Sequence, residues 1–341
     1  MTRLGVTGVG PGGAIASWLA DTARAVFVRR PGPSHDQREL AFRRYQREVR
    51  RRVRVGRSQF VLTDARELAS GSRRVVELEF DSATPVQPGD VLWLWWRNPE
   101  EAVAEHAPSE ALVRYWTTPI PHEPSRRRSG TRRDVLTRVV DLSAAAPGFS
   151  LSRVPRITPR IFTTSDARAH GAAWRFRLQV TTSQEWPHRA SAFLSELTAG
   201  EQVEGWALPH PHRLTTVRSA GLAVVTGSGA AAVFAALRSG VRDVGLIWGL
   251  GDKTLAPWVK DELRGFTDSG ALRDLRVVRS PHRVTDELAG IDLACVLEGE
   301  GWLFVSGNES MAEAADAHVR TSVESAVVER AERELRYIVS A

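Results

Sequence analysis

Residues 220–240 read AGLAVVTGSGAAAVFAALRSG, which is a short apolar run, a glycine-rich turn and an alanine-rich segment. An apolar run bounded by a turn is typical of a strand buried on both faces, and the alanine-rich segment predicts a helix. Similar units follow it, namely VGLIWGLGD (244–252) with WVKDELRGFTDSG (258–270), LRVVRSP (275–281) and GWLFVSGNESMAEAADAHV (301–319). This alternation predicts a doubly wound α/β domain over residues 216–341, whose ligand lies at the carboxyl ends of parallel strands.

The chain before this domain has another pattern. Short β-rich runs separated by Gly, Pro and Asp predict an antiparallel β-barrel over residues 58–215. These runs are QFVLTDARELA (59–69), RRVVELEFD (73–81), QPGDVLWLWW (87–96), RIFTTSD (160–166), AWRFRLQVTTS (173–183) and EQVEGWALP (201–209). Between about residues 97 and 150, EEAVAEHAPSEALVRYW (100–116) and RRDVLTRVVDLSAAAPG (132–148) predict a small helical insertion.

Positive charge is concentrated at the start of the chain. The formal net charge is +6, but residues 1–57 hold thirteen arginines against four acids, so this basic arm carries +9 and the remainder about −3. The arm lacks stacking aromatics and any zinc or RNA-binding signature, which argues against nucleic acid. A dock for an acidic protein partner and a solvated, partly helical face both remain open.

The arm also contains a G-x-G-x-x-G pattern at Gly8, Gly10 and Gly13. This spacing suits a dinucleotide pyrophosphate at a helix N-terminus only within a strand–helix–strand unit. Arginine-rich sequence follows instead of further strands and helices, so we interpret the pattern as a turn.

Other features limit the class of protein. No stretch of eighteen apolar residues and no signal-peptide layout occurs, so we expect a cytoplasmic protein without a membrane segment. The single cysteine, Cys295, excludes an internal disulfide and a thiolate metal cluster. His210 and His212 have no acidic partner in the sequence, so we expect surface histidines and no metal site.

The ordered segments between Gln59 and Met311 resemble the reductase module of the diflavin reductase family, the ferredoxin–NADP reductase-like part of sulfite reductase flavoprotein. The Pro-Gly-Asp turn at 88–90 and the segment SGALRDLRVVRS (269–280) carry much of this resemblance. It implies a barrel that binds FAD, with a small helical insertion, followed by an α/β doubly wound parallel-sheet domain that binds NADPH or NADH.

The resemblance places FAD on two motifs. The family's Arg-x-Tyr-Ser corresponds to Arg160-Ile161-Phe162-Thr163, which implies that Arg160 pairs with the pyrophosphate, Phe162 faces the isoalloxazine and Thr163 approaches flavin N5. The family's second motif, a turn opening a helix, aligns with His188-Arg189-Ala190-Ser191, so Arg189, Ala190 and Ser191 are expected at the pyrophosphate. Tyr337 is the aromatic nearest the C-terminus and is expected to cover the flavin ring.

The nicotinamide motifs are more diverged. The family's diphosphate loop is represented by Thr226 to Phe234, with Thr226, Gly227 and Gly229 as the expected contacts. The set that reads the 2′-phosphate is represented by Ser280 and Arg283, which gives a slight preference for NADPH. The family's Cys-Gly-(Asp/Asn) is represented by Ser306-Gly307-Asn308, so Ser306 and Asn308 are expected beside the nicotinamide, with hydride transfer slower than is usual in the family.

The resemblance thus implies an FAD-dependent NAD(P)H oxidoreductase. The flavodoxin domain of diflavin reductases is replaced by the basic arm, so we expect electrons to leave to a separate acidic acceptor, such as a flavodoxin, a ferredoxin or a monooxygenase. Two alternatives stay open: a flavoenzyme of specialised metabolism with little nicotinamide use, and a non-catalytic pseudo-reductase that acts as a binding or scaffold subunit.

Overall fold

The structure is a computed structural model that describes residues 47–48, 51, 57–98, 100–106, 112–116, 127–142, 157, 159–183, 190–210, 214–216, 220–334 and 336–340. The glycine pattern at Gly8, Gly10 and Gly13, most of the basic arm, Arg189 and His212 lie outside these residues.

The first domain is an antiparallel barrel. Its strands follow one another around the barrel in the order β1, β2, β7, β6, β3 and β8, and a pairing of β1 with β8 closes it. The strands are β1 (Ser58–Ser70), β2 (Arg73–Ser82), β3 (Val91–Leu94), β6 (Arg160–His170), β7 (Ala173–Ser183) and β8 (Gln202–Leu208). Inward-facing residues such as Leu62, Leu78 and Leu178 form its core. The predicted barrel strands are all confirmed.

The insertion carries helices α3 (Glu100–His106) and α4 (Arg132–Arg138) and, in addition, a two-stranded ribbon of β4 (Leu112–Trp116) and β5 (Arg127–Thr131). The sequence predicts a helical insertion, whereas residues 112–116 within it form a strand. Pairing with β5 gives this segment, which is rich in β-branched and aromatic residues, a strand partner that its own sequence does not reveal. Asn98 joins the insertion to the barrel, because its amide donates to the carbonyls of Leu136 and Val140.

The second domain has a five-stranded parallel sheet in the order β12, β10, β9, β13 and β14. These strands are β9 (Gly221–Thr226), β10 (Val244–Gly251), β12 (Leu272–Arg279), β13 (Trp302–Ser306) and β14 (Tyr337–Ser340). Along β9, Ala223 and Val225 face one core while Leu222 and Val224 face the other, which is why the whole run is apolar. The predicted α/β parallel-sheet domain is confirmed.

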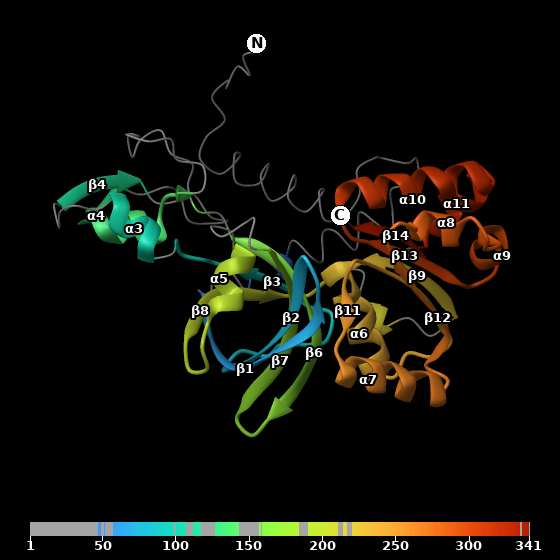
Figure 1. The fold of residues 1–341 in the computed structure, drawn as a ribbon, viewed down its shortest axis with the longest axis horizontal. Helices are drawn as coiled ribbons and strands as arrows, with labels where there is room; N and C mark the ends of the chain where they lie inside the picture. Colours follow the sequence, from blue (N-terminus) through green and yellow to red (C-terminus); the bar gives the residue numbers. More distant parts are fainter. Residues whose placement is uncertain are drawn as a thin grey trace, which may run out of the picture.

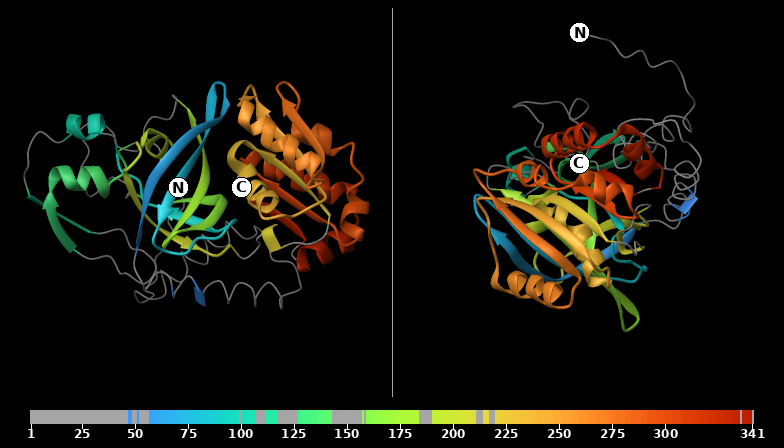
Figure 2. Two further views of the ribbon diagram at one scale, coloured as in Figure 1. Left: turned by 90° about the horizontal axis from the view of Figure 1, so that it is seen from below. Right: turned by 90° about the vertical axis from the view of Figure 1, so that its right-hand side faces the viewer.

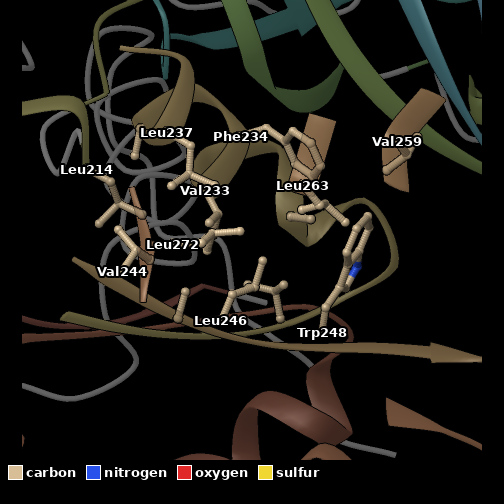
Figure 3. Close-up of a cluster of buried hydrophobic side chains, with 14 of the residues drawn as sticks. Leu214, Val233, Phe234, Leu237, Val244, Leu246, Trp248, Val259, Leu263 and Leu272 are labelled. Carbon is tan, nitrogen blue, oxygen red and sulfur yellow. The ribbon is translucent and has the colours of Figure 1, made fainter. Parts of the chain in front are cut away.

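Helices cover both faces of this sheet. A short 3₁₀ turn η3 (Gly227–Ala230), α6 (Ala231–Arg238) and α7 (Pro257–Asp268) lie on one face, with another 3₁₀ turn, η2 (Leu214–Thr216), beside them. Figure 3 shows Val233, Phe234 and Leu237 of α6 packing onto Leu246 and Trp248 of the sheet. The opposite face is covered by α8 (Val284–Leu288), α9 (Leu293–Glu298), α10 (Glu309–Ser322) and α11 (Ser325–Arg333).

The barrel lies between the insertion and the α/β domain, as two directions of view show (Figures 1 and 2). One further helix, α5 (Ala190–Glu196), packs on β7. No helix in the described part of the chain combines the length and the apolar character that a bilayer span requires.

The two domains share one core. Strand β11 (Thr254–Leu255), which follows the β10 strand of the α/β domain, pairs with the end of β1 and so extends the barrel sheet. Leu68, Ala69 and Val75 of the barrel belong to the same buried cluster as Phe234 of α6. The surfaces that face each other across the domain boundary are therefore held in a fixed relation.

Candidate functional site

A cavity of about 930 Å³ lies where the barrel meets the carboxyl ends of the parallel strands. Phe162, Thr163 and Thr181 line it from the barrel, and Thr226, Gly249 and Ser306 line it from the ends of β9, β10 and β13. Its volume is within the range of small-molecule sites, and its position is the usual one for a ligand of an open parallel sheet.

The turn after β9 forms one wall. Gly227 has φ of +54°, a left-handed conformation that favours glycine. A Cβ atom at Gly229 would lie 2.6 Å from the Ser306 carbonyl oxygen, so only glycine fits between this turn and β13. Trp248 Nε1 donates to the Gly227 carbonyl (3.1 Å), which holds the turn against β10. Thr226, Gly227 and Gly229 all line the cavity, and their contact with a dinucleotide diphosphate stays a prediction from sequence.

The end of β13 forms the adjacent wall through Ser306, Gly307 and Asn308. Asn308 is the N-cap of α10: its Oδ1 accepts hydrogen bonds from the Met311 backbone N–H and the Ser310 hydroxyl, both at 2.9 Å. Its amide oxygen thus binds the helix N-terminus, whereas the Ser306 hydroxyl has no side-chain hydrogen-bond partner among the described residues.

The barrel contributes the opposite wall. Phe162 and Thr163 are half-buried on β6, and Thr163 pairs across the sheet with Val91, which also lines the cavity. Phe162 packs against the barrel core. The Thr181 hydroxyl donates a hydrogen bond to Ser228 Oγ (3.1 Å) across the domain boundary. Phe162, Thr163 and Thr181 therefore line the same cavity as the glycine turn, and Thr181 contacts that turn directly.

The electrostatics of the cavity are positive. Arg73, Lys253, His282 and Arg283 line it, and no acidic side chain does so among the described residues. Lys253 is buried, and its Nζ donates to the Leu250 carbonyl at 3.0 Å. Burial and the nearby Arg73 guanidinium lower the pKa of Lys253, while Asp252 opposes them. An anionic ligand would neutralise this wall.

Several predicted residues lie elsewhere. Arg160 is exposed at the start of β6 and Ser280 is exposed at the end of β12, and neither lines the cavity. Ala190 is buried against Trp96 and Ile157 at the start of α5, and Ser191 follows it there. Among the described residues, the cavity therefore brings together Phe162, Thr163 and Arg283 with the turn after β9 and the end of β13, while Arg160, Ala190, Ser191 and Ser280 do not line it.

The prediction that Tyr337 covers a flavin ring is wrong. Its side chain is buried in the core beneath β14, and its hydroxyl donates to Asp316 Oδ1 of α10 at 2.8 Å. Burial, together with the Asp316 carboxylate, raises the pKa of Tyr337. Because β14 pairs with β13 as a sheet strand, its alternate side chains are directed into the core and away from the cavity.

Sequence reasoning missed several lining residues, including Arg73, Gln179, Thr181 and Lys253. Lys253 had a usable signal, because it follows a predicted parallel strand within the segment GLGDK. Gln179 and Thr181 had none, since a polar residue on a barrel strand is ordinarily directed to solvent.

Comparisons with known proteins support the fold. A scan against protein-family models and a search of curated proteins both found no match. Among solved structures, ferredoxin–NADP⁺ reductase from Plasmodium falciparum matches with a TM-score of 0.52 and 10% identity, over 83% of this chain and 95% of that chain. A point mutant of that enzyme in complex with 2′P-AMP matches with a TM-score of 0.50 and 11% identity, over 79% and 95% of the two chains. The chain therefore has a ferredoxin–NADP⁺ reductase-like fold.

Proposed function

We propose that the protein is a flavin-dependent oxidoreductase that takes hydride from a reduced nicotinamide dinucleotide and passes the electrons to a separate acceptor. The observation that carries the proposal is the cavity itself. It joins an aromatic barrel wall to a glycine turn at the carboxyl end of a central parallel strand, and its charged lining residues are cationic. A solved structure with the same fold is named as a ferredoxin–NADP⁺ reductase.

The dinucleotide side fits the proposal well. The backbone N–H groups at the start of the η3–α6 segment belong to the Thr226–Gly229 turn that lines the cavity, and such groups suit a phosphate. Lys253 and Arg73 add positive charge to the lining of the same cavity, which suits phosphate groups. Arg283 would supply a cation for a 2′-phosphate, so we propose NADPH ahead of NADH.

On the flavin side, the residues expected at the isoalloxazine ring support the proposal. Phe162 offers an aromatic face, and Thr163 offers a hydroxyl group at the same wall of the cavity. Arg160 lies outside the cavity, so its assignment to the FAD pyrophosphate stays a prediction from sequence.

When bound, the two cofactors would supply the electron-carrying ring and the hydride. The residues of the chain would then hold and orient them, with Thr163 and Ser306 offering hydroxyl groups from opposite walls. Val91, Leu250 and Met311 give the cavity apolar surfaces that exclude water. No acidic side chain lines the described wall, which agrees with a reaction that needs positioning more than a strong acid or base.

An absorbance spectrum tests the proposal directly. The purified protein, incubated with FAD and freed of excess, is expected to show flavin absorbance that bleaches anaerobically on addition of NADPH, and more slowly with NADH. Flavin absorbance that neither nucleotide bleaches would favour a flavoenzyme with little nicotinamide use. A colourless protein would favour a non-catalytic subunit.

We further propose an acidic protein as the electron acceptor. The last arginine of the basic arm, Arg57, lies over the Trp95 ring at 4.0 Å and pairs with Glu204 at 3.1 Å, which fixes the end of the arm on the barrel. The rate of electron transfer to such an acceptor is expected to fall steeply as salt is raised, whereas reduction by NADPH is expected to change little.

A further inference from the structure

Gln179 lies in the middle of β7, and 3% of its surface is exposed. It belongs to the residues that line the cavity, yet neither Nε2 nor Oε1 of its side-chain amide has a hydrogen-bond partner within the described part of the chain. A buried amide normally finds partners for both atoms, because leaving them unpaired costs free energy. An orphaned donor and an orphaned acceptor at a cavity wall together indicate a ligand that supplies both.

The neighbours of Gln179 do not fill this role. Strand pairing places Gln179 opposite Glu77 on β2, but Glu77 is occupied by Arg66, Arg238 and the Ser165 hydroxyl. On its own strand, Thr181 is the next residue on the same face, and its hydroxyl bonds to Ser228. The pairing of Thr164 with Leu178 places Thr163 of β6 beside Gln179 at the cavity wall.

The two unpaired atoms restrict the chemistry of the ligand. A phosphate or carboxylate would satisfy Nε2 and leave Oε1 facing a negative charge, whichever way the amide is turned. A group that presents an acceptor beside a donor satisfies both atoms of a side-chain amide at once. A primary carboxamide and a cyclic imide both have this pattern, and a nicotinamide carries the first while a flavin carries the second.

We infer that Gln179 is a specificity-determining residue whose amide binds the carboxamide or imide edge of the ligand in this cavity. The inference rests on the proposed function and names the polar edge that this site recognises. It also explains why a glutamine is tolerated at a position otherwise enclosed by protein.

The test is a set of binding titrations by calorimetry on the full-length wild-type protein and on Gln179→Leu, with Gln179→Met as a second variant. The probes are NADP⁺, adenosine 2′,5′-bisphosphate, FAD and N3-methylated FAD. Gln202→Leu, at an exposed glutamine on β8, is the control and is expected to bind every probe as the wild type does.

Two results would support the inference, and they distinguish a carboxamide ligand from an imide ligand. If the edge is a carboxamide, both variants bind NADP⁺ about tenfold more weakly and the bisphosphate, which lacks that group, equally well. If the edge is an imide, both variants bind FAD about tenfold more weakly, and methylated FAD no longer distinguishes them from wild type. In either case the ligand-free variants unfold at the same temperature as wild type or higher, because they bury no unpaired amide.

Other results overturn the inference. Unchanged affinity of both variants for all probes that the wild type binds would remove Gln179 from recognition while leaving the proposed function intact. A lower unfolding temperature of both ligand-free variants would assign Gln179 a structural role. A wild-type protein that binds neither FAD nor NADP⁺ would overturn the inference together with the proposed function.

Discussion

At the scale of single residues, Lys253 is unusual because its ammonium group is buried in the cavity wall with a backbone carbonyl as its hydrogen-bond partner. Burial of a charge disfavours the charged form. The pKa of Lys253 is lowered for this reason first and by the Arg73 guanidinium, while the Asp252 carboxylate opposes both. An anion bound beside Lys253 would reverse the shift.

Replacing Lys253 by methionine is expected to weaken binding of NADP⁺ by about ten- to a hundredfold, because a charge-assisted hydrogen bond to phosphate is lost. The ligand-free variant is expected to be at least as stable as wild type near neutral pH, since it no longer buries a charge. Titration calorimetry and thermal unfolding measure the two effects. Lys260→Met, at the exposed lysine of α7, is the control and should change neither.

The lowered pKa of Lys253 also predicts proton uptake. In the alkaline range below the ordinary lysine value of 10.5, the free folded protein binds fewer protons at this site than the unfolded chain does, so this contribution to stability rises with pH. Binding of an anion restores the proton, so NADP⁺ binding in that range is expected to take up protons. Calorimetry in buffers of different protonation enthalpy measures this uptake, and Lys253→Met should abolish it.

At the scale of elements, the 3₁₀ turn η3, which follows β9 directly, sets one wall of the cavity. Its shape depends on the left-handed backbone at Gly227 and on the close approach of Gly229 to the carbonyl group of Ser306. The obstructing atoms at Gly229 are backbone, which does not move aside as a flexible side chain would.

A methyl group at this turn is therefore expected to be costly. Gly229→Ala should lower the free energy of unfolding by about 1–3 kcal/mol and weaken nucleotide binding, because η3 and the end of β13 must separate at the cavity. Gly265→Ala is the matched control: Gly265 is exposed within α7 and has open space around it, so alanine should stabilise the protein by about 0.5–1 kcal/mol. Chemical denaturation measures both. Equal stability of the two variants would contradict the crowding at Gly229.

At the scale of the whole molecule, a buried ion network fastens the two domains together. Arg238 of α6 donates to Glu77 of the barrel at 2.9 Å and to Glu262 of α7 at 2.8 Å. Arg66 also pairs with Glu77 at 2.7 Å and stacks over the Trp258 ring at 3.6 Å. Together with the pairing of β11 and β1, this network gives the domain boundary buried contacts like those inside a single domain.

Loss of Arg238 is expected to loosen that boundary. Arg238→Met removes one of the cations that pair with the buried Glu77 carboxylate. The change should lower the free energy of unfolding by about 3–5 kcal/mol. Calorimetry is expected to show one transition for wild type and two for the variant. The exposed pair of Arg264 and Asp261 provides the control, because Arg264→Met should cost at most about 1 kcal/mol.

The same network predicts how stability depends on pH. Burial alone would raise the pKa of Glu77, but Arg238 and Arg66 outweigh burial and lower it below 4.5. The stabilisation by Glu77 is thus present above about pH 4.5 and is lost as pH falls through its lowered value. The stability difference between wild type and Arg238→Met should shrink on acidification, as denaturation at a series of pH values would show.

The sequence alone determined the two domains, because their signals are local. Continuous apolar runs joined to helices specify a parallel sheet, and short alternating runs between turns specify a barrel. The same locality explains why Thr226, Gly227, Gly229 and Ser306 could be placed at the site: the carboxyl ends of parallel strands meet at one edge of the sheet.

Only the tertiary structure decided which other side chains reach the cavity. Tyr337 is buried because residues 337–340 form a strand of the sheet, and residues 112–116 form a strand because β5 lies beside them. Gln179 and Lys253 line the cavity because the two domains pack against each other there, whereas Arg160 lies outside the cavity. Their positions depend on contacts between segments far apart in the chain, and such contacts leave no periodic trace in the sequence of either segment.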